Sequence, residues 1–186
     1  MTILMNIREP NVTDRHSDII AGTVLGGSSL TKPARGKNCY LSMRGKDNLW
    51  LEYKALELKD LASDAPFTVE KTLRWHSLCY PIFNKFRNMF YQEGNRVLQP
   101  EPLDRLHDVG LAIWYGDCGS YHNGKVTLRT HIWGRQGTLL VASYFDAIGC
   151  PGEIGQEKKC WRFYMEGDSA KRYLEQVLPQ LPSFMA

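Results

Sequence analysis

Leu111-Ala112-Ile113-Trp114-Tyr115-Gly116-Asp117-Cys118-Gly119-Ser120 is the stretch that decides the fold. It is an apolar run, rich in small residues, that ends in an acidic turn containing a glycine. A looser copy, Ile20-Ala21-Gly22-Thr23-Val24-Leu25-Gly26-Gly27-Ser28, begins about half a chain length earlier. Solenoid repeats have much shorter periods, so this spacing indicates two similar halves. Both runs predict buried helices in which small residues allow a second backbone to come close.

The composition is that of an ordinary globular protein with a mildly basic balance. Its 186 residues are 43% hydrophobic and 23% charged, with a formal net charge of +3. The five cysteines form no C-x-x-C pair, which argues against a disulfide framework or a zinc site. No apolar run is long enough to span a membrane, and no targeting signal is evident. We therefore expect an intracellular, cytoplasmic protein with no membrane partner.

The periodicities predict the same order of elements twice. We expect an arm at 1–17, a first half at 18–92, a linker at 93–107 and a second half at 108–186. Helices are expected at 18–26, 47–59, 81–92, 108–118, 138–148 and from 168 to 178, and half-buried strands at 38–44, 67–76, 125–133 and 158–166. Ser17 or Asp18 is expected to cap the first helix and Asp108 the helix of the second run. Leu49, Tyr53 and Leu56 are expected along one face of the helix at 47–59.

One face of the expected strands collects polar side chains, many of them basic. These residues are Asn38, Tyr40, Ser42, Arg44, Thr72, Arg74, His76, Lys125, Thr127, Arg129, His131, Lys158 and Arg162. Any antiparallel sheet with one solvated face shows such alternation, so a merely wet surface is the alternative. Arginine, lysine, asparagine and threonine also contact phosphates and base edges, and a β-ribbon fits the major groove of DNA. We predict that this face binds nucleic acid.

The second run, with its flanking segments, carries a family likeness. Leu111 to Gly119 resembles the motif of the LAGLIDADG homing endonucleases, in their single-chain form with two motif copies. Phe90-Tyr91, Gly94-Asn95-Arg96-Val97 and the terminal Leu178-Pro179 and Pro182-Ser183-Phe184-Met185 are also similar to one branch of that family. The resemblance covers the chain from Asp18 onward.

This resemblance implies an α+β fold of two pseudo-symmetric αββαββα halves. Paired motif helices would lie at the centre, and two antiparallel sheets would form a DNA-binding saddle over double-stranded DNA. The small residues expected to let the two helices approach are Ala21, Gly22, Gly26, Ala112 and Gly116. The two halves already form a covalent pseudo-dimer, so a monomer is expected. RNA is the alternative partner.

The chain departs from the family at the catalytic positions. The resemblance implies an acid before each closing glycine that binds Mg²⁺ or Mn²⁺, but Gly27 and Cys118 stand there. Glycine offers no ligand, and a soft thiol suits Mg²⁺ poorly. Asp117 is the remaining candidate catalytic residue and metal ligand, in a site that uses Mg²⁺ or Mn²⁺ if the protein is active. Cys118 itself, at a helix C-terminus beside Asp117, is expected to be a protonated packing residue rather than a nucleophile.

Three functions follow as hypotheses. The first is a site-specific homing-type DNA endonuclease that uses metal-dependent phosphodiester hydrolysis. The second is a DNA- or RNA-binding protein that keeps the saddle without cleavage, such as a regulator or splicing helper. The third is a protein–protein module on the same fold. Salt-dependent binding to nucleic acid would separate the first two from the third.

Overall fold

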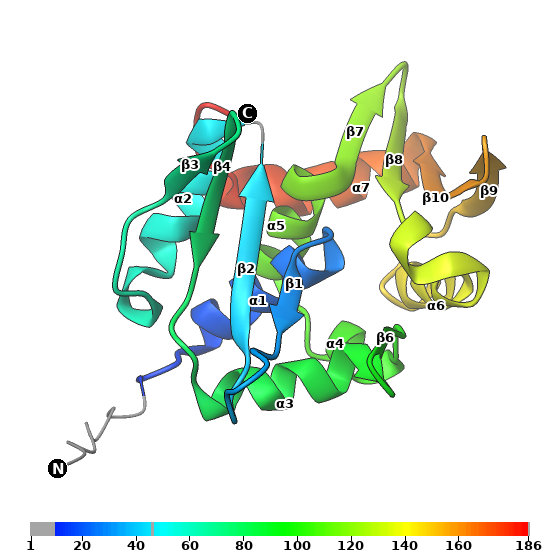
Figure 1. Ribbon diagram of the computed structural model, residues 1–186. Helices are drawn as coiled ribbons and strands as arrows, with labels where there is room; N and C mark the ends of the chain where they lie inside the picture. The colour runs from blue at the N-terminus through cyan, green and yellow to red at the C-terminus, as the bar shows by residue number, and fades with distance from the viewer. Residues whose placement is uncertain (1–9, 46, 186) are drawn as a thin grey trace, which may run out of the picture.

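The first half of the chain runs helix, two strands, helix, two strands, helix in the computed structural model (Figure 1), which describes residues 10–45 and 47–185. Its elements are α1 (Asp14–Leu25), β1 (Ser29–Thr31), β2 (Tyr40–Gly45), α2 (Asn48–Glu57), the 3-10 turn η1 (Lys59–Leu61), β3 (Phe67–Val69), β4 (Thr72–His76) and α3 (Pro81–Phe90). The strands alternate buried and more exposed residues, most regularly in β2 and β4.

The second half repeats this order after a short connection. The connection holds the hairpin β5 (Tyr91–Gln92) and β6 (Asn95–Arg96) and the helix α4 (Pro100–Asp104). The second half then consists of α5 (Asp108–Cys118), β7 (Gly119–His122), β8 (Lys125–Arg129), η2 (His131–Trp133), α6 (Gly134–Ala147), β9 (Glu153–Glu157), β10 (Cys160–Glu166), α7 (Gly167–Val177) and η3 (Leu178–Gln180). The expected α+β fold of two αββαββα halves is confirmed.

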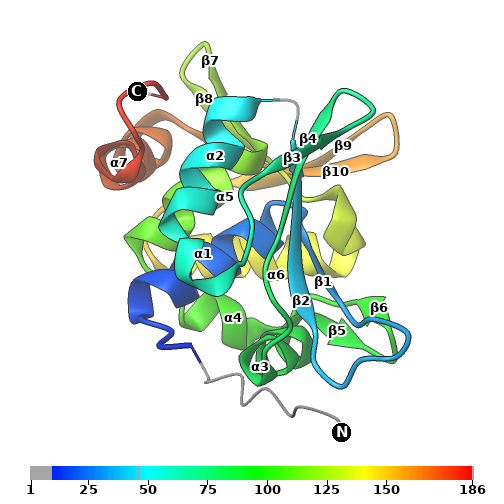
Figure 2. The ribbon, with the colours of Figure 1, turned by 60° about the vertical axis from the view of Figure 1, so that its left-hand side comes forward.

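Each half builds its own four-stranded antiparallel sheet. The strand orders are β1-β2-β4-β3 and β7-β8-β10-β9, which are equivalent under the internal repeat. Helix α2 packs against β2 and β4, whereas α6 and α7 pack against β10. Figure 2 shows α1, α2 and α5 on the same side of the first sheet. The helices therefore bury one face of each sheet and leave the polar faces to carry the candidate site.

The motif helices α1 and α5 cross at the centre of the molecule with their backbones in close contact (Figure 1). A Cβ atom added to Gly22 would lie 2.3 Å from the carbonyl oxygen of Gly110 and 3.0 Å from the Cβ of Ile113. Only a residue without a side chain fits there. Gly22 was expected at the crossing, but Gly110, one residue ahead of the quoted motif, was not.

Polar contacts define the start of α1 and tie this helix to the start of α5. Thr13, not Ser17 or Asp18, caps α1, because its hydroxyl accepts from the His16 amide at 3.2 Å. The caps expected for both motif helices were therefore wrong, because His107 holds the N-cap position of α5 and Asp108 is the first residue of that helix. Asp18 lies inside α1 and is buried; its carboxylate accepts from the backbone amide of His107, the residue that precedes α5, at 3.1 Å. A carboxylate of α1 thus accepts a hydrogen bond from the residue that precedes α5.

The single strand expected at 67–76 is wrong. Residues Phe67–Val69 and Thr72–His76 form a hairpin, because Glu70 and Lys71 adopt positive φ angles of 49° and 64° and turn the chain. Neither residue is a glycine or asparagine, so the sequence carries no ordinary turn signal at this point. The alternation read across the whole segment belongs to β4 alone.

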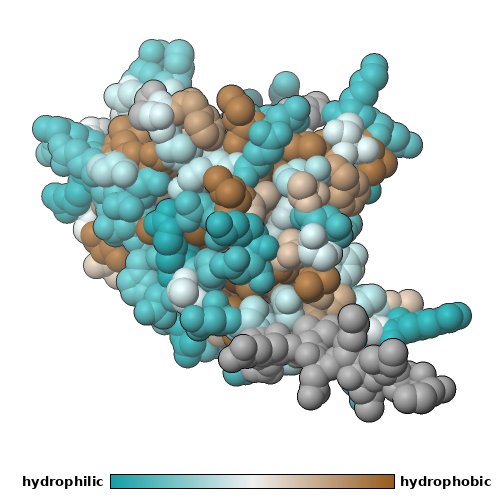
Figure 3. Space-filling model, turned by 90° about the vertical axis from the view of Figure 1, so that its left-hand side faces the viewer, coloured by the Kyte–Doolittle hydropathy of each residue, from teal (hydrophilic) through white to brown (hydrophobic). Residues whose placement is uncertain are grey.

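The face of α2 that was expected from its leucines is exposed. Leu49 and Leu56 are 60% and 65% exposed, whereas Trp50 and Lys54 are buried. Figure 3, which views the molecule from the side of α2, shows apolar side chains scattered among hydrophilic ones. A buried lysine in place of a leucine requires a partner, and α5 of the other half supplies it, as described below.

The close contact of α1 and α5 predicts that Gly22→Ala destabilises the protein. Alanine normally gains about 1 kcal/mol over glycine inside a helix. The clash with Gly110 should outweigh that gain, so chemical denaturation should show a free energy of unfolding lower by about 1–3 kcal/mol. Gly45→Ala, in strand β2, is the control for a substitution without a clash, because its added Cβ meets nothing closer than 3.5 Å. Equal or greater stability of Gly22→Ala would contradict the described packing.

Candidate functional site

The two motif helices end at equivalent positions of the two sheets. Ser29 of β1 pairs with Ser42 of β2, and Ser120 of β7 pairs with Thr127 of β8. Counting back two residues from each serine places Gly27 and Cys118 in the same relation to their sheets. The structure thus agrees with the alignment of the two runs in sequence. The residues around these two ends form the candidate site.

An arginine binds the backbone at the end of the first motif. Gly27 has a φ of +121°, and a Cβ atom built on it would have no heavy atom within 4 Å. Nη2 of Arg96, in β6, donates to the carbonyl oxygens of Gly27 at 3.2 Å and Ser28 at 2.7 Å. The Arg96 guanidinium lies 5.6 Å from the centre of the Tyr91 ring and 5.9 Å from that of Trp133. A fixed cation therefore sits just beyond the C-terminal end of α1, on two carbonyls of the segment that leads into β1.

An arginine also binds the backbone at the end of the second motif. Nε of Arg129 donates to the Cys118 carbonyl at 3.3 Å, and its Nη2 donates to the Asp117 carbonyl at 3.2 Å. The thiol of Cys118 is buried, and desolvation, assisted by the Asp117 charge, raises its pKa to about 12. The thiol is therefore protonated at neutral pH and is not a nucleophile in this state.

Asp117 turns toward the first half of the molecule. Its Oδ1 accepts from Nε1 of Trp50 at 2.7 Å and from Nζ of Lys54 at 2.5 Å, both on α2. The lysine and aspartate side chains are 5% and 12% exposed, so this is a buried ion pair between the halves. The other oxygen, Oδ2, packs against Gly26 and has no hydrogen-bond partner within residues 10–45 and 47–185.

The residues at the motif ends do not fit Mg²⁺ or Mn²⁺. These ions need several oxygen ligands, chiefly carboxylates. Gly27 supplies none, Cys118 carries a protonated thiol, and Lys54 already neutralises Asp117. Within the described residues no three His, Cys, Asp or Glu side chains gather closely enough to hold a metal. The guanidinium groups of Arg96 and Arg129 on the backbone carbonyls would also repel a cation.

The polar face of the first sheet carries an arginine-lined pocket. Arg44 of β2 lies opposite Arg74 of β4, and Ser42 lies opposite His76. A pocket of about 280 Å³ is lined by Gly27, Ser28, Ser29, Ser42, Arg44, Arg74, His76 and Arg96. Desolvation and the Arg74 charge lower the pKa of His76, so its imidazole is neutral at pH 7. The structure thus brings four predicted residues next to Gly27.

The second sheet repeats this arrangement with its charges partly paired. Arg129 lies opposite Arg162, and Thr127 lies opposite Tyr164. Arg162 forms an ion pair with Glu157 at 2.8 Å, and Lys125 forms one with Glu166 at 2.6 Å. The two pairs of facing arginines therefore occupy equivalent sites, but acids moderate the charge of the second sheet.

Three predicted residues lie outside the strands in which they were expected. Asn38 precedes β2 and accepts from Nδ2 of Asn84 at 3.0 Å. His131 belongs to η2, and Lys158 lies in the β9–β10 turn with a φ of 47°. The expected strand bounds were too long at these points. Tyr40 and Thr72 lie in β2 and β4 as expected, and the Tyr40 ring centre is 5.3 Å from that of His76.

Two residues that sequence reasoning missed organise the site. Arg96 lies in the segment assigned as a linker, where its place in the quoted Gly94-Asn95-Arg96-Val97 run was the available signal. Lys54 stands four positions after Trp50, a spacing that puts both on one helix face, but a lysine there reads as solvated. Its role depends on Asp117, 63 residues away.

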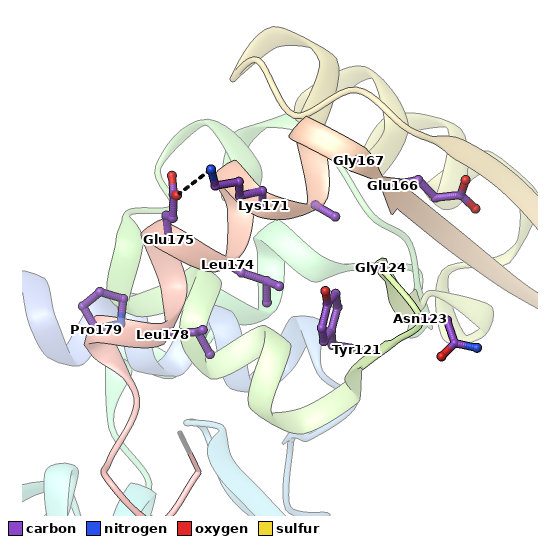
Figure 4. Close-up of a pocket in the computed structure, with 11 residues that line it drawn as sticks. Tyr121, Asn123, Gly124, Glu166, Gly167, Lys171, Leu174, Glu175, Leu178 and Pro179 are labelled. Atoms are coloured by element: carbon purple, nitrogen blue, oxygen red, sulfur yellow. Dashed lines mark ion pairs between the residues drawn. The ribbon is translucent and has the colours of Figure 1, made fainter.

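A larger cavity lies elsewhere. It has a volume of about 750 Å³ and lies between α7 and the β7–β8 hairpin, with Tyr121, Leu174 and Leu178 on its walls (Figure 4). Lys171 and Glu175, 3.9 Å apart, line it from α7. It contains none of the predicted site residues.

Among the described residues, no helix is long and apolar enough to cross a membrane.

Known proteins share the fold of this chain. The family model of the LAGLIDADG DNA endonuclease family matches residues 17–173. No curated protein sequence matches the chain. The homing endonuclease I-WcaI bound to its DNA recognition sequence is 16% identical and superposes with a TM-score of 0.87, over 94% of this chain and 85% of that one.

More distant structures share the fold. I-DmoI in complex with DNA and Mn is 10% identical with a TM-score of 0.63, over 92% of this chain and all of that one. Full-length DUF199/WhiA from Thermatoga maritima is 11% identical with a TM-score of 0.59, over 90% of this chain and 57% of that one. The family model covers most of the chain, and the protein therefore belongs to the LAGLIDADG DNA endonuclease family.

Proposed function

We propose that the protein binds double-stranded DNA across its two sheets and does not hydrolyse it by a metal-dependent route. The basic sheet faces support the first part. Arg44 faces Arg74 and Arg129 faces Arg162, and like charges directly opposite each other destabilise a sheet. A phosphate backbone laid over both sheets would offset that repulsion. The structure of I-WcaI bound to its DNA recognition sequence supports the same surface by analogy of fold.

The observation that carries the second part is that Gly27 and Cys118 stand where the acids are expected and that an arginine lies against the backbone at each motif end. Arg96 and Arg129 each donate to two backbone carbonyls there, and the Asp117 carboxylate is tied to Lys54. Two-metal hydrolysis requires acids that hold the ions at the scissile phosphates. With fixed positive groups in their place, the motif ends can attract phosphate but cannot activate water through a metal.

The internal repeat suggests how the protein engages its target. In this proposal residues 18–92 and 108–186 each contact one half of an asymmetric DNA site, and residues 93–107 join them. One chain then suffices, and the protein binds as a monomer. Duplex DNA is favoured over duplex RNA, because the major groove of A-form RNA is too narrow for side chains to read.

A metal-dependent endonuclease is the alternative, and one observation favours it. Oδ2 of Asp117 has no hydrogen-bond partner in the described part of the chain. A movement at the end of α5 that breaks the pair with Lys54 would free a carboxylate at the end of the second motif. Such a site would have one acid where two-metal hydrolysis uses several ligands, which is why binding without cleavage is preferred.

Duplex binding is tested by fluorescence anisotropy with random-sequence DNA and RNA duplexes over a range of salt concentrations. We expect affinity for DNA that falls steeply with salt. The Arg129→Ala and Arg162→Ala variants should bind more weakly and lower the salt slope by about 1 each. Arg105→Ala, at a surface arginine of the connection that is 68% exposed, is the control. Unchanged affinity in both sheet variants would refute this binding face.

Cleavage is tested with a plasmid library incubated with Mg²⁺ or Mn²⁺. We expect no specific products from the native protein or from Asp117→Asn. If the native protein forms products that Asp117→Asn does not, the endonuclease alternative is correct. Products from both proteins would also contradict the proposal and would place catalysis outside Asp117.

The state of the Cys118 thiol can be measured by alkylation at pH 8. Its pKa of about 12 leaves almost no thiolate, and the side chain is buried. Mass spectrometry should show modification of the exposed Cys79 and Cys160 first, with Cys118 modified only after unfolding. Rapid modification of Cys118 in the folded protein would show an accessible thiolate and would reopen a catalytic role for it.

A further inference from the structure

Three aromatic rings lie next to one another on the polar face of the first sheet. The ring centres of Tyr40 in β2 and His76 in β4 are 5.3 Å apart, and the Phe67 ring, in the edge strand β3, lies edge-on to His76 at 5.4 Å. Phe67 faces Arg74 directly across the ladder, so both side chains belong to the same face. Single apolar side chains are common on protein surfaces. Tyr40, His76 and Phe67 instead form a continuous aromatic row across three neighbouring strands.

The aromatic row ends in an exposed and uncharged ring. Phe67 is 43% exposed, and its phenyl group has no hydrogen-bonding atom. Desolvation and the Arg74 charge lower the pKa of His76, so the ring that supports Phe67 is neutral at pH 7. A phosphate would gain little from contact with this end of the sheet, whereas an apolar group would be removed from water there. The end of the row therefore suits an apolar ligand group.

The second sheet carries a glycine at the equivalent edge position. Arg162 corresponds to Arg74, since each faces the other arginine of its pair. Gly155 of the edge strand β9 faces Arg162, where the first sheet has Phe67. A Cβ atom built on Gly155 would lie 2.8 Å from Cε2 of Tyr164, so a ring from the neighbouring strand covers this glycine. The apolar projection of the first sheet is thus replaced by bare backbone under a tyrosine.

The position of Tyr40 also differs between the halves. Counting back four residues from the facing arginine of β2 and of β8 places Lys125 where the first sheet has Tyr40. Nζ of Lys125 lies 4.8 Å from the centre of the Tyr164 ring and pairs with Glu166 at 2.6 Å. The second sheet therefore presents a paired charge where the first presents an aromatic ring.

We infer that Phe67, supported by His76 and Tyr40, contacts the C5-methyl group of a thymine in the half of the duplex that lies against the first sheet. This inference rests on the proposed function, because it requires duplex DNA on the sheet. The thymine methyl group is the apolar group that a base pair offers in the major groove, and phenylalanine is among the side chains that contact it. Cytosine carries a hydrogen atom at the same position, so the contact distinguishes the two pyrimidines. The two halves would then read their half-sites by different chemistry.

Duplexes that contain thymine or uracil test the contact, because the two bases differ only in the methyl group. A duplex is first selected from a random library with the native protein, and each of its thymines is then replaced in turn by deoxyuridine. We expect about fourfold weaker binding at one or two positions within a single half-site, since one methyl-sized apolar group loses its contact there. Replacement in the other half-site should leave the affinity unchanged.

The variant Phe67→Ala identifies the side chain that makes the contact. It should bind the sensitive thymine and uracil duplexes equally. Tyr121→Ala is the matched control: Tyr121 is also an exposed aromatic residue, but it faces the buried Val126 and so lies on the opposite face of the second sheet. This control should keep the native preference for thymine. The duplex comparison with the native protein keeps the test valid if Phe67→Ala does not fold.

The outcomes separate this inference from the proposed function. If the native protein binds duplex DNA but uracil weakens binding at no position, the inference is overturned and the proposed function stands. A thymine preference that persists in Phe67→Ala also overturns it, because another residue then makes the contact. If the native protein binds no duplex at all, the proposed function is refuted and the inference falls with it.

Discussion

The contact between the backbones of α1 and α5 sets the position of the two halves of the molecule relative to each other. Gly22 lies directly against the carbonyl of Gly110, so the two helices are closer than side chains would allow. Their C-terminal ends are then brought together as well, with Asp117 packed on Gly26. Each sheet begins at the end of one of these helices. The relative placement of the two polar faces is therefore set at a single point.

Each half places a guanidinium group on backbone carbonyls near the end of its motif helix, but the two arginines come from different parts of the chain. The C-terminal carbonyls of a helix carry partial negative charge, and a cation beside them is favourable. Arg129 provides it at the last carbonyls of α5 from within its own sheet, whereas Arg96, from the connection between the halves, binds the two carbonyls just beyond α1. Guanidinium is always charged and cannot dissociate as a metal ion does. The symmetry of the fold is thus kept while the symmetry of its charges is lost.

The sequence predicts the architecture well because periodicity and the internal repeat are local signals. The helix at 108–118 has the expected bounds, and the facing arginines lie on the strands read from alternation. The turn at Glu70 and Lys71 escaped prediction because neither residue type favours positive φ. Lys54 and Arg96 escaped because their partners lie more than 60 residues away in sequence. Pairings across that distance are fixed by the tertiary packing and not by local pattern.

The geometry of Gly27 makes its divergence from the family hard to reverse. At a φ of +121°, residues with a Cβ atom are strongly disfavoured, so an aspartate there would demand a different backbone path. At Cys118 a new carboxylate would be buried beside that of Asp117, where like charge and desolvation both oppose ionisation. A carboxylate introduced by substitution would therefore meet a cost set by the fold at either position, in backbone conformation at Gly27 and in suppressed ionisation at Cys118.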